Sequence, residues 1–92
     1  MPQIFKFGQY RIYFWSNENE PLEPIHVHVI IGRPTKDATK IWITQNGKAV
    51  LCHNRSKIPS DDLSKIMKML TVNSDEIINK WYEVFGEIRF YD

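Results

Sequence analysis

The 92-residue chain is long enough for one hydrophobic core and too short for two, so we expect a single domain over residues 1–92. Its composition, 42% hydrophobic and 25% charged, is that of a folded globular protein and excludes a disordered one. Twelve Lys and Arg residues against eleven Asp and Glu leave a formal charge of +1. This balance disfavours a dedicated nucleic-acid binder, which needs a clear basic excess, but it still allows a local basic patch.

Cysteine content and hydropathy indicate the compartment. Cys52 is the single cysteine and has no partner for an intramolecular disulfide, so nothing points to an oxidising environment. The first residues contain no basic stretch leading into a long apolar segment, as a signal peptide would. No run approaches the roughly 20 apolar residues of a membrane helix. We therefore expect a cytoplasmic protein without a membrane segment.

Two β-prone runs open the chain, at residues 4–7 and 10–15, and Gly8-Gln9 separates them. A Gly-X pair between two strands favours a type II′ hairpin, which would place Phe7 opposite Tyr10. The second run is apolar on both faces. That pattern predicts a strand inside the sheet, or an edge strand covered by helices.

An acidic loop with two prolines, residues 16–24, leads into a third predicted strand at residues 25–31. The odd-numbered residues of this strand are all Ile or Val, so they form the expected core face. The even-numbered residues, His26, His28 and Ile30, would occupy the opposite, non-core face. Residues 32–37 form the next predicted loop.

The central hairpin has the strongest local signal, because Asn46-Gly47 lies between two alternating runs and favours a type I′ turn. The register that follows pairs Gln45 with Lys48, Ile43 with Val50, Trp42 with Leu51, Ile41 with Cys52 and Lys40 with His53. On this register Cys52 shares the core face with Ile41. We therefore interpret Cys52 as a buried structural thiol and not as a nucleophile.

Two helices are predicted after residue 59. Ser60 is the expected N-cap of the first, and its apolar face combines Leu63, Ile66, Met67 and Leu70. Asn73 and Glu76 have capping-box spacing at the start of the second helix, and Gly86 is its expected end. The buried stripe of the second helix comprises Ile77, Ile78, Trp81 and Phe85. Residues 87–91 could return as a last strand.

These elements predict an α+β fold: a mostly antiparallel sheet of about five strands with a C-terminal helical hairpin packed on one face. The chain also resembles the bacterial family called domain of unknown function 4160. The resemblance lies in Met-Pro-x-Ile-Phe at the start, the Tyr-x-Ile-Tyr-Phe strand, Glu20-Pro21 through Pro24-Ile25-His26-Val27-His28-Val29, Ala38-x-Lys40-x-Trp42, and the closing helix with Trp81. Leu22-Glu23 between the two prolines departs from the family pattern by lengthening the loop.

The resemblance implies a fold and a bacterial source, but no activity. Similar short proteins are commonly encoded beside another small reading frame, which suggests a two-gene module of the toxin–antitoxin type. Our first functional hypothesis is therefore a small protein-interaction module whose partner protein is encoded by an adjacent gene. This hypothesis depends on which genes lie side by side, and it gives no molecular mechanism.

The second hypothesis concerns His26 and His28, which are two residues apart on one strand and therefore leave the same face about 6.5–7 Å apart at the backbone. Two imidazoles at this spacing can converge on one metal ion. Glu20 or Glu23 from the preceding loop, or His53 from the central hairpin, would supply a third ligand. Such a set suits zinc, manganese or iron.

The same pair could act without a metal. A histidine beside a carboxylate can serve as general acid or base, as RNA cleavage through the 2′-hydroxyl requires, and this makes His26 and His28 candidate catalytic residues. Arg33, Lys36 and Arg55 could bind phosphate nearby.

Simpler interpretations stand beside these. The two histidines can be half-exposed strand residues, one bonded to a loop carbonyl, and the aromatic set Tyr13, Trp15 and Trp42 can be core and not a platform for stacked bases. A pocket that converges on both histidines and a glutamate would favour a hydrolase or ribonuclease. A flat apolar sheet face or an open edge would favour the interaction module.

Overall fold

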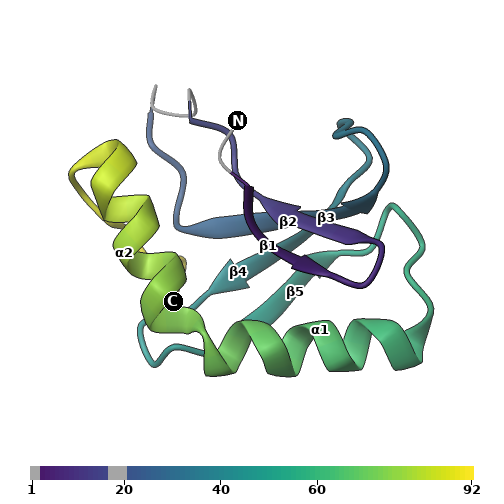
Figure 1. Cartoon of the computed structure of the whole chain (residues 1–92). Coiled ribbons are helices and arrows are strands. Elements are labelled where there is room, and N and C mark those ends of the chain that lie inside the picture. The colour runs from purple at the N-terminus through teal and green to yellow at the C-terminus, as the bar shows by residue number, and fades with distance from the viewer. Residues whose placement is uncertain (1–2, 17–20) are drawn as a thin grey trace.

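The computed structural model describes residues 3–16 and 21–92, which form a five-stranded sheet and two helices (Figure 1). The elements are β1 (Gln3–Phe7), β2 (Tyr10–Tyr13), β3 (His26–Ile31), β4 (Thr39–Ile43), β5 (Ala49–His53), α1 (Ser60–Val72) and α2 (Ser74–Phe85). The strands follow one another in the sheet in chain order, and every neighbouring pair is antiparallel. The two helices pack against this sheet. The predicted α+β fold is therefore confirmed.

The first hairpin forms as predicted. Phe7 lies opposite Tyr10, and Gly8 has a φ of 58° while the φ of Gln9 is negative, as a type II′ turn requires. β2 lies between β1 and β3, so its side chains are buried on both faces: Ile12 and Tyr13, which point in opposite directions, are each 0% exposed. The apolar pattern on both faces of this strand therefore correctly predicted its position inside the sheet.

The central hairpin is confirmed, but its predicted register is wrong by one residue next to the turn. Gly47 N–H donates to Thr44 O (2.9 Å) and Thr44 N–H donates to Lys48 O (2.9 Å), so the loop spans residues 45–47. Only Gly47 has a positive φ, 77°, whereas a type I′ turn needs positive φ at both central residues. The longer loop pairs Ile43 with Ala49, Trp42 with Val50 and Ile41 with Leu51.

A β-bulge restores the predicted register at the other end of this hairpin. The pairing shifts between Lys40 and Ile41, so that Lys40 again lies opposite His53, and Cys52 is the extra residue that faces no residue of β4. Cys52 is exposed. The prediction of a buried core thiol is therefore wrong, because it depended on a regular ladder along the whole hairpin.

The core lies between the sheet and the two helices. Ile66 and Leu70 of α1 and Ile77 and Trp81 of α2 are buried, which confirms both predicted stripes. Their partly buried companions in the stripes also pack on this core: Leu63, Met67, Ile78 and Phe85. Trp81 is fully buried, with ring-centroid distances of 5.0 Å to Phe14 and 4.5 Å to Phe85. The core is therefore closed by aromatic rings at the α2 end.

The helix ends differ in part from the predictions. Pro59, not Ser60, is the N-cap of α1, and its carbonyl accepts from Leu63 N–H (2.9 Å). Asn73 precedes α2, but the capping box does not form, because Asn73 Nδ2 donates to Met69 O at the end of α1 (2.8 Å). Gly86 ends α2 with a φ of 73°, as predicted. Neither helix is long and apolar enough to cross a membrane.

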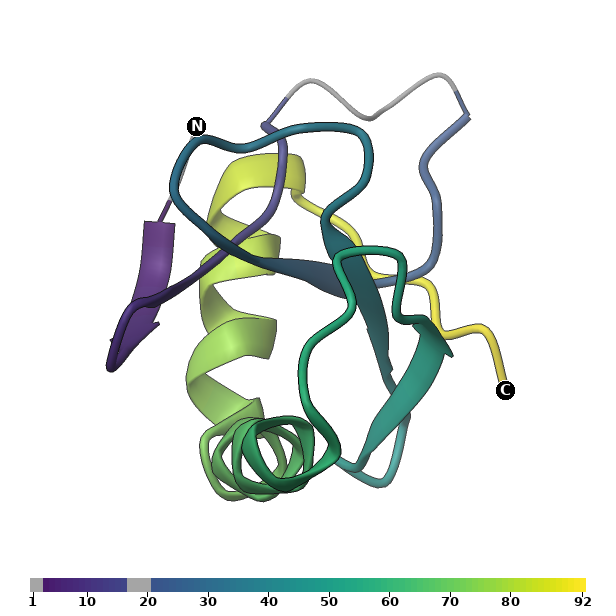
Figure 2. The ribbon, with the colours of Figure 1, turned by 90° about the vertical axis from the view of Figure 1, so that its right-hand side faces the viewer.

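Residues 87–91 do not form the predicted last strand. Arg89 O accepts from Ile25 N–H (2.8 Å), which ties this C-terminal segment to the residue before β3. Asp92 Oδ1 accepts from Gln45 N–H (3.3 Å). The C-terminal segment, yellow in Figure 2, thus reaches the side of the strands that faces away from α1 and α2.

Candidate functional site

One face of the sheet carries all three histidines. The register places Tyr13, His28, Lys40 and His53 side by side across β2 to β5, and His26 lies opposite Trp42 two residues along β3. These side chains alternate with Val27, Val29 and Ile41, which belong to the core, so they leave the sheet on the side opposite the helices. We call this surface the histidine face and define it by Tyr13, His26, His28, Lys40, Trp42 and His53.

His26 lies on the predicted face but is 0% exposed, so the expectation that it is a half-exposed strand residue is wrong. Its ring centroid lies 5.4 Å from Trp81 of α2, 5.8 Å from Trp42 and 5.0 Å from His28. α2 therefore reaches the start of β3 and encloses an imidazole that the strand alternation alone would leave outside. His28, two residues further along the strand, is only partly buried.

The loop before β3 sets the orientation of the His26 ring. His26 Nδ1 lies 2.9 Å from Pro24 O, and a carbonyl oxygen can only accept, so Nδ1 carries a proton. In the neutral imidazole the lone pair is then on Nε2. A backbone carbonyl holds metal-binding and proton-transferring histidines in the same way. The expected bond from one histidine to a loop carbonyl is therefore present, and it belongs to His26.

The aromatic set belongs mostly to the packing of the histidine face. Tyr13 is fully buried, with its ring centroid 5.4 Å from His28 and 5.5 Å from Trp15. Trp42 is stacked on Tyr91 of the C-terminal segment at 5.3 Å. Since Tyr91 already covers the Trp42 ring, this ring is not an open platform for bases.

Of the two candidate carboxylate ligands, Glu20 and Glu23, only Glu23 lies within the described residues. Glu23 Oε1 lies 2.7 Å from Lys40 Nζ, and the same ammonium lies 4.6 Å above the centre of the Trp42 ring, so Lys40 engages the Glu23 carboxylate. Glu20 lies outside the described residues. Within residues 3–16 and 21–92, no group of three His, Cys, Asp or Glu side chains is arranged to hold a metal ion.

His53 reaches the histidine face because of the bulge at Cys52. Burial lowers the pKa of His53, and the positive charges of Arg55, Lys40 and His28 lower it further. The neutral imidazole is therefore favoured. Lys40 lies between His28 and His53 in the row, so these two histidines are separated by a cation and by two strand spacings, about 9.5 Å at the backbone. His53 is therefore badly placed as a third ligand.

The candidate phosphate-binding residues do not gather at the histidines. Arg33 and Lys36 are exposed in the loop after β3, at the opposite end of that strand from His26. Arg55 is exposed two residues after His53. Only Arg55 therefore lies near the histidine face.

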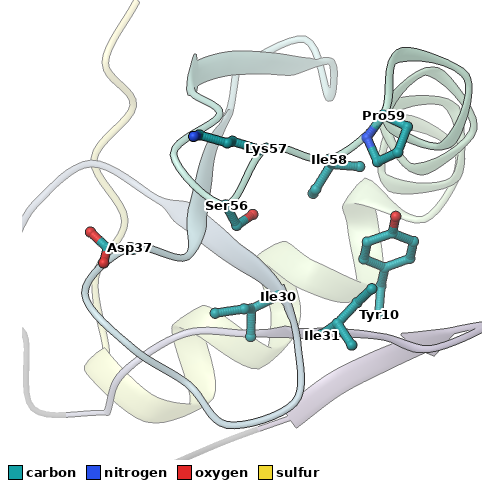
Figure 3. Close-up of a pocket in the computed structure, with 8 residues that line it drawn as sticks. All are labelled: Tyr10, Ile30, Ile31, Asp37, Ser56, Lys57, Ile58 and Pro59. Atoms are coloured by element: carbon teal, nitrogen blue, oxygen red, sulfur yellow. The ribbon is translucent and has the colours of Figure 1, made fainter.

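A pocket of about 300 Å³ lies elsewhere, between the end of β3 and the loop before α1 (Figure 3). It is lined by Tyr10, Ile30, Ile31, Asp37, Ser56, Lys57, Ile58 and Pro59. At its rim Tyr10 Oη donates to Asp62 Oδ2 (2.7 Å); burial, this hydrogen bond and the charge of Asp62 raise the pKa of Tyr10. No histidine lines this pocket, the neighbouring one beside Phe7 and Gly8, or the one on the outer face of α1.

Comparison with known proteins gave one finding. Residues 10–82, which include β2 to β5, α1 and most of α2, match a domain of unknown function, DUF4160. No curated protein and no solved structure matches the chain. The match confirms the resemblance to this family, and the chain belongs to the DUF4160 family.

Proposed function

We propose that this chain is a protein-interaction module that works as a single domain in the bacterial cytoplasm, as one component of a two-gene, toxin–antitoxin-like pair. One observation carries the proposal: β5 and the end of α1, which a hydrogen bond from Ala49 N–H to Thr71 Oγ1 (3.1 Å) joins, each expose a large apolar side chain. Leu51 of β5 is 40% exposed and Val72 of α1 is 82% exposed. Large apolar side chains exposed on two joined elements are typical of protein-binding surfaces.

The position of β5 supports this proposal. β5 is the last strand of the described sheet, and residues 49–53 contain no Asp, Glu, Lys or Arg, the charges that usually protect an edge from other chains. α1 contacts one end of the strand, where Thr71 Oγ1 accepts from Ala49 N–H (3.1 Å). Leu51 and Cys52 beyond that contact are exposed.

The test is co-expression with the protein encoded by the adjacent gene, followed by size-exclusion chromatography and calorimetric titration. We expect a complex that Leu51→Glu and Val72→Glu each weaken at least tenfold, because a carboxylate cannot be buried against an apolar partner without cost. Tyr82→Glu on α2 is the matched control, since Tyr82 is 57% exposed and belongs to neither β5 nor α1. Absence of a complex with the wild-type protein would refute the proposal.

A small hydrolase or ribonuclease that uses His26 and His28, with or without a divalent metal such as zinc or manganese, is the second candidate. The fixed His26 ring favours it: Nδ1 is held by Pro24 O and the His28 ring centroid is 5.0 Å away. Glu20 would be the third ligand, because Lys40 already engages Glu23.

Zinc and manganese titrations of the wild-type protein test the metal-dependent form of this candidate. His28→Ala is expected to abolish binding, and binding should weaken as the pH falls, because protons compete for the imidazole nitrogens. His53→Ala is the matched control, since Lys40 separates His53 from His28, and it should leave the affinity within about twofold. Wild-type protein that binds neither metal at micromolar concentration would exclude a metal site at this pair.

A further inference from the structure

The outer face of α1 carries a hollow of about 420 Å³ lined by Ser64, Met67, Lys68, Thr71 and Val72. Their spacing of three, four, seven and eight residues places all five on one stripe of the helix. We call this hollow the α1 groove. We propose that it binds an acidic amphipathic helix of the partner protein. This inference rests on the proposed interaction function and names the chemistry of the partner.

The groove has the apolar character that such a helix needs. Val72 is 82% exposed at its end. Met67 lies partly buried in its floor, and a flexible thioether adapts to the shape of an incoming side chain. Thr71 uses its hydroxyl within the protein, donating to Met67 O (3.0 Å) and accepting from Ala49 N–H (3.1 Å). Its methyl group therefore remains as the part that can meet a partner.

Positive charges border the groove. Lys68 lines it, and Lys65 is exposed beside Ser64. Lys48 is the residue before Ala49, whose N–H donates to Thr71 Oγ1. Within the described part of the chain none of these three ammonium groups is paired with a carboxylate. The nearest carboxylates along the sequence, Asp62 and Asp75, lie beyond the two ends of the stripe, and Asp62 accepts a hydrogen bond from Tyr10. A partner with carboxylates beside its apolar stripe would match this pattern.

A helix fits this surface better than an added strand. Strand addition needs a regular row of free backbone groups on β5. Here Ala49 N–H is already bonded to Thr71, and the bulge at Cys52 interrupts the ladder two residues after Val50. α1, in contrast, presents a stripe over nine of its 13 residues, 64–72, about 13 Å long, against which the side chains of a second helix can pack.

The probes are two synthetic helical peptides with the same leucine stripe, one with glutamates and one with lysines at the flanking positions. Each is titrated into isotope-labelled full-length protein and followed by amide chemical shifts and fluorescence anisotropy. We expect the glutamate peptide to bind at least tenfold more tightly and to shift the amides of residues 64–72. Lys65→Glu with Lys68→Glu should reverse the preference. Lys36→Glu, an exposed charge in the loop after β3, should leave it unchanged.

Equal affinity for both peptides, no binding of the glutamate peptide at millimolar concentration, or shifts confined to the histidine face would each overturn the inference. These results differ from a failure of the proposed function, which is decided by complex formation with the adjacent-gene product. Thermal melts of the double-lysine variant separate a loss of binding from a loss of folding. Both lysines are exposed on α1, so the variant is expected to melt within a few degrees of the wild type.

Discussion

Replacing Trp81 with alanine is expected to lower the free energy of unfolding by about 3–5 kcal/mol, the cost of removing a buried aromatic ring. Trp81 is 0% exposed, and its ring lies against Phe14, Phe85 and His26. One substitution therefore opens a cavity between the sheet and α2 and also removes a wall of the His26 environment. For a domain of this size such a loss is a large part of the typical total stability of about 5–15 kcal/mol.

Urea unfolding followed by circular dichroism measures this effect. Tyr82→Ala is the control, because it removes a neighbouring aromatic ring that is 57% exposed and should change the stability by less than about 0.5 kcal/mol. A cost below about 1 kcal/mol for Trp81→Ala would contradict the position of α2 on the sheet. If the alanine variant does not fold, Trp81→Phe should give a measurable, smaller loss.

Gly47→Val is expected to destabilise the protein by about 2–5 kcal/mol through two separate effects. Gly47 has a φ of 77°, and a side chain in this left-handed region costs about 1–2 kcal/mol. A Cβ atom at Gly47 would also lie 2.7 Å from Ser74 Oγ at the start of α2, and overpacking of this kind costs about 1–3 kcal/mol. The turn between β4 and β5 and the start of α2 are thus in direct contact.

Two comparisons separate these effects. Gly8 also has a positive φ, 58°, but a Cβ there would meet no atom within 4 Å, so Gly8→Val should show the backbone cost alone. In the second comparison, Ser74→Ala removes the hydroxyl and should relieve part of the cost of Gly47→Ala in a double-mutant cycle. Equal losses for Gly8→Val and Gly47→Val would show that the contact with Ser74 has no energetic weight.

Local sequence signals determined the parts of the fold that depend on neighbouring residues. The Gly8-Gln9 hairpin, the stripes of α1 and α2 and the stop at Gly86 were predicted correctly, because backbone preference and side-chain periodicity act over a few residues. The His26–His28 pair and the family were also recognisable from the sequence. The two histidines are only two residues apart in a strand that follows a proline, so this pair is a local feature of the sequence.

Only the tertiary structure decided the features that depend on contacts between segments far apart in the chain. The three-residue turn and the bulge at Cys52 nearly cancel in the register, so Lys40 met His53 as predicted while Cys52 left the core. The strand alternation could not show that Trp81, far along the chain, would enclose His26. Nor could composition show that Lys40 would engage Glu23. Burial and ion pairing depend on which elements meet in space, and no local pattern encodes that meeting.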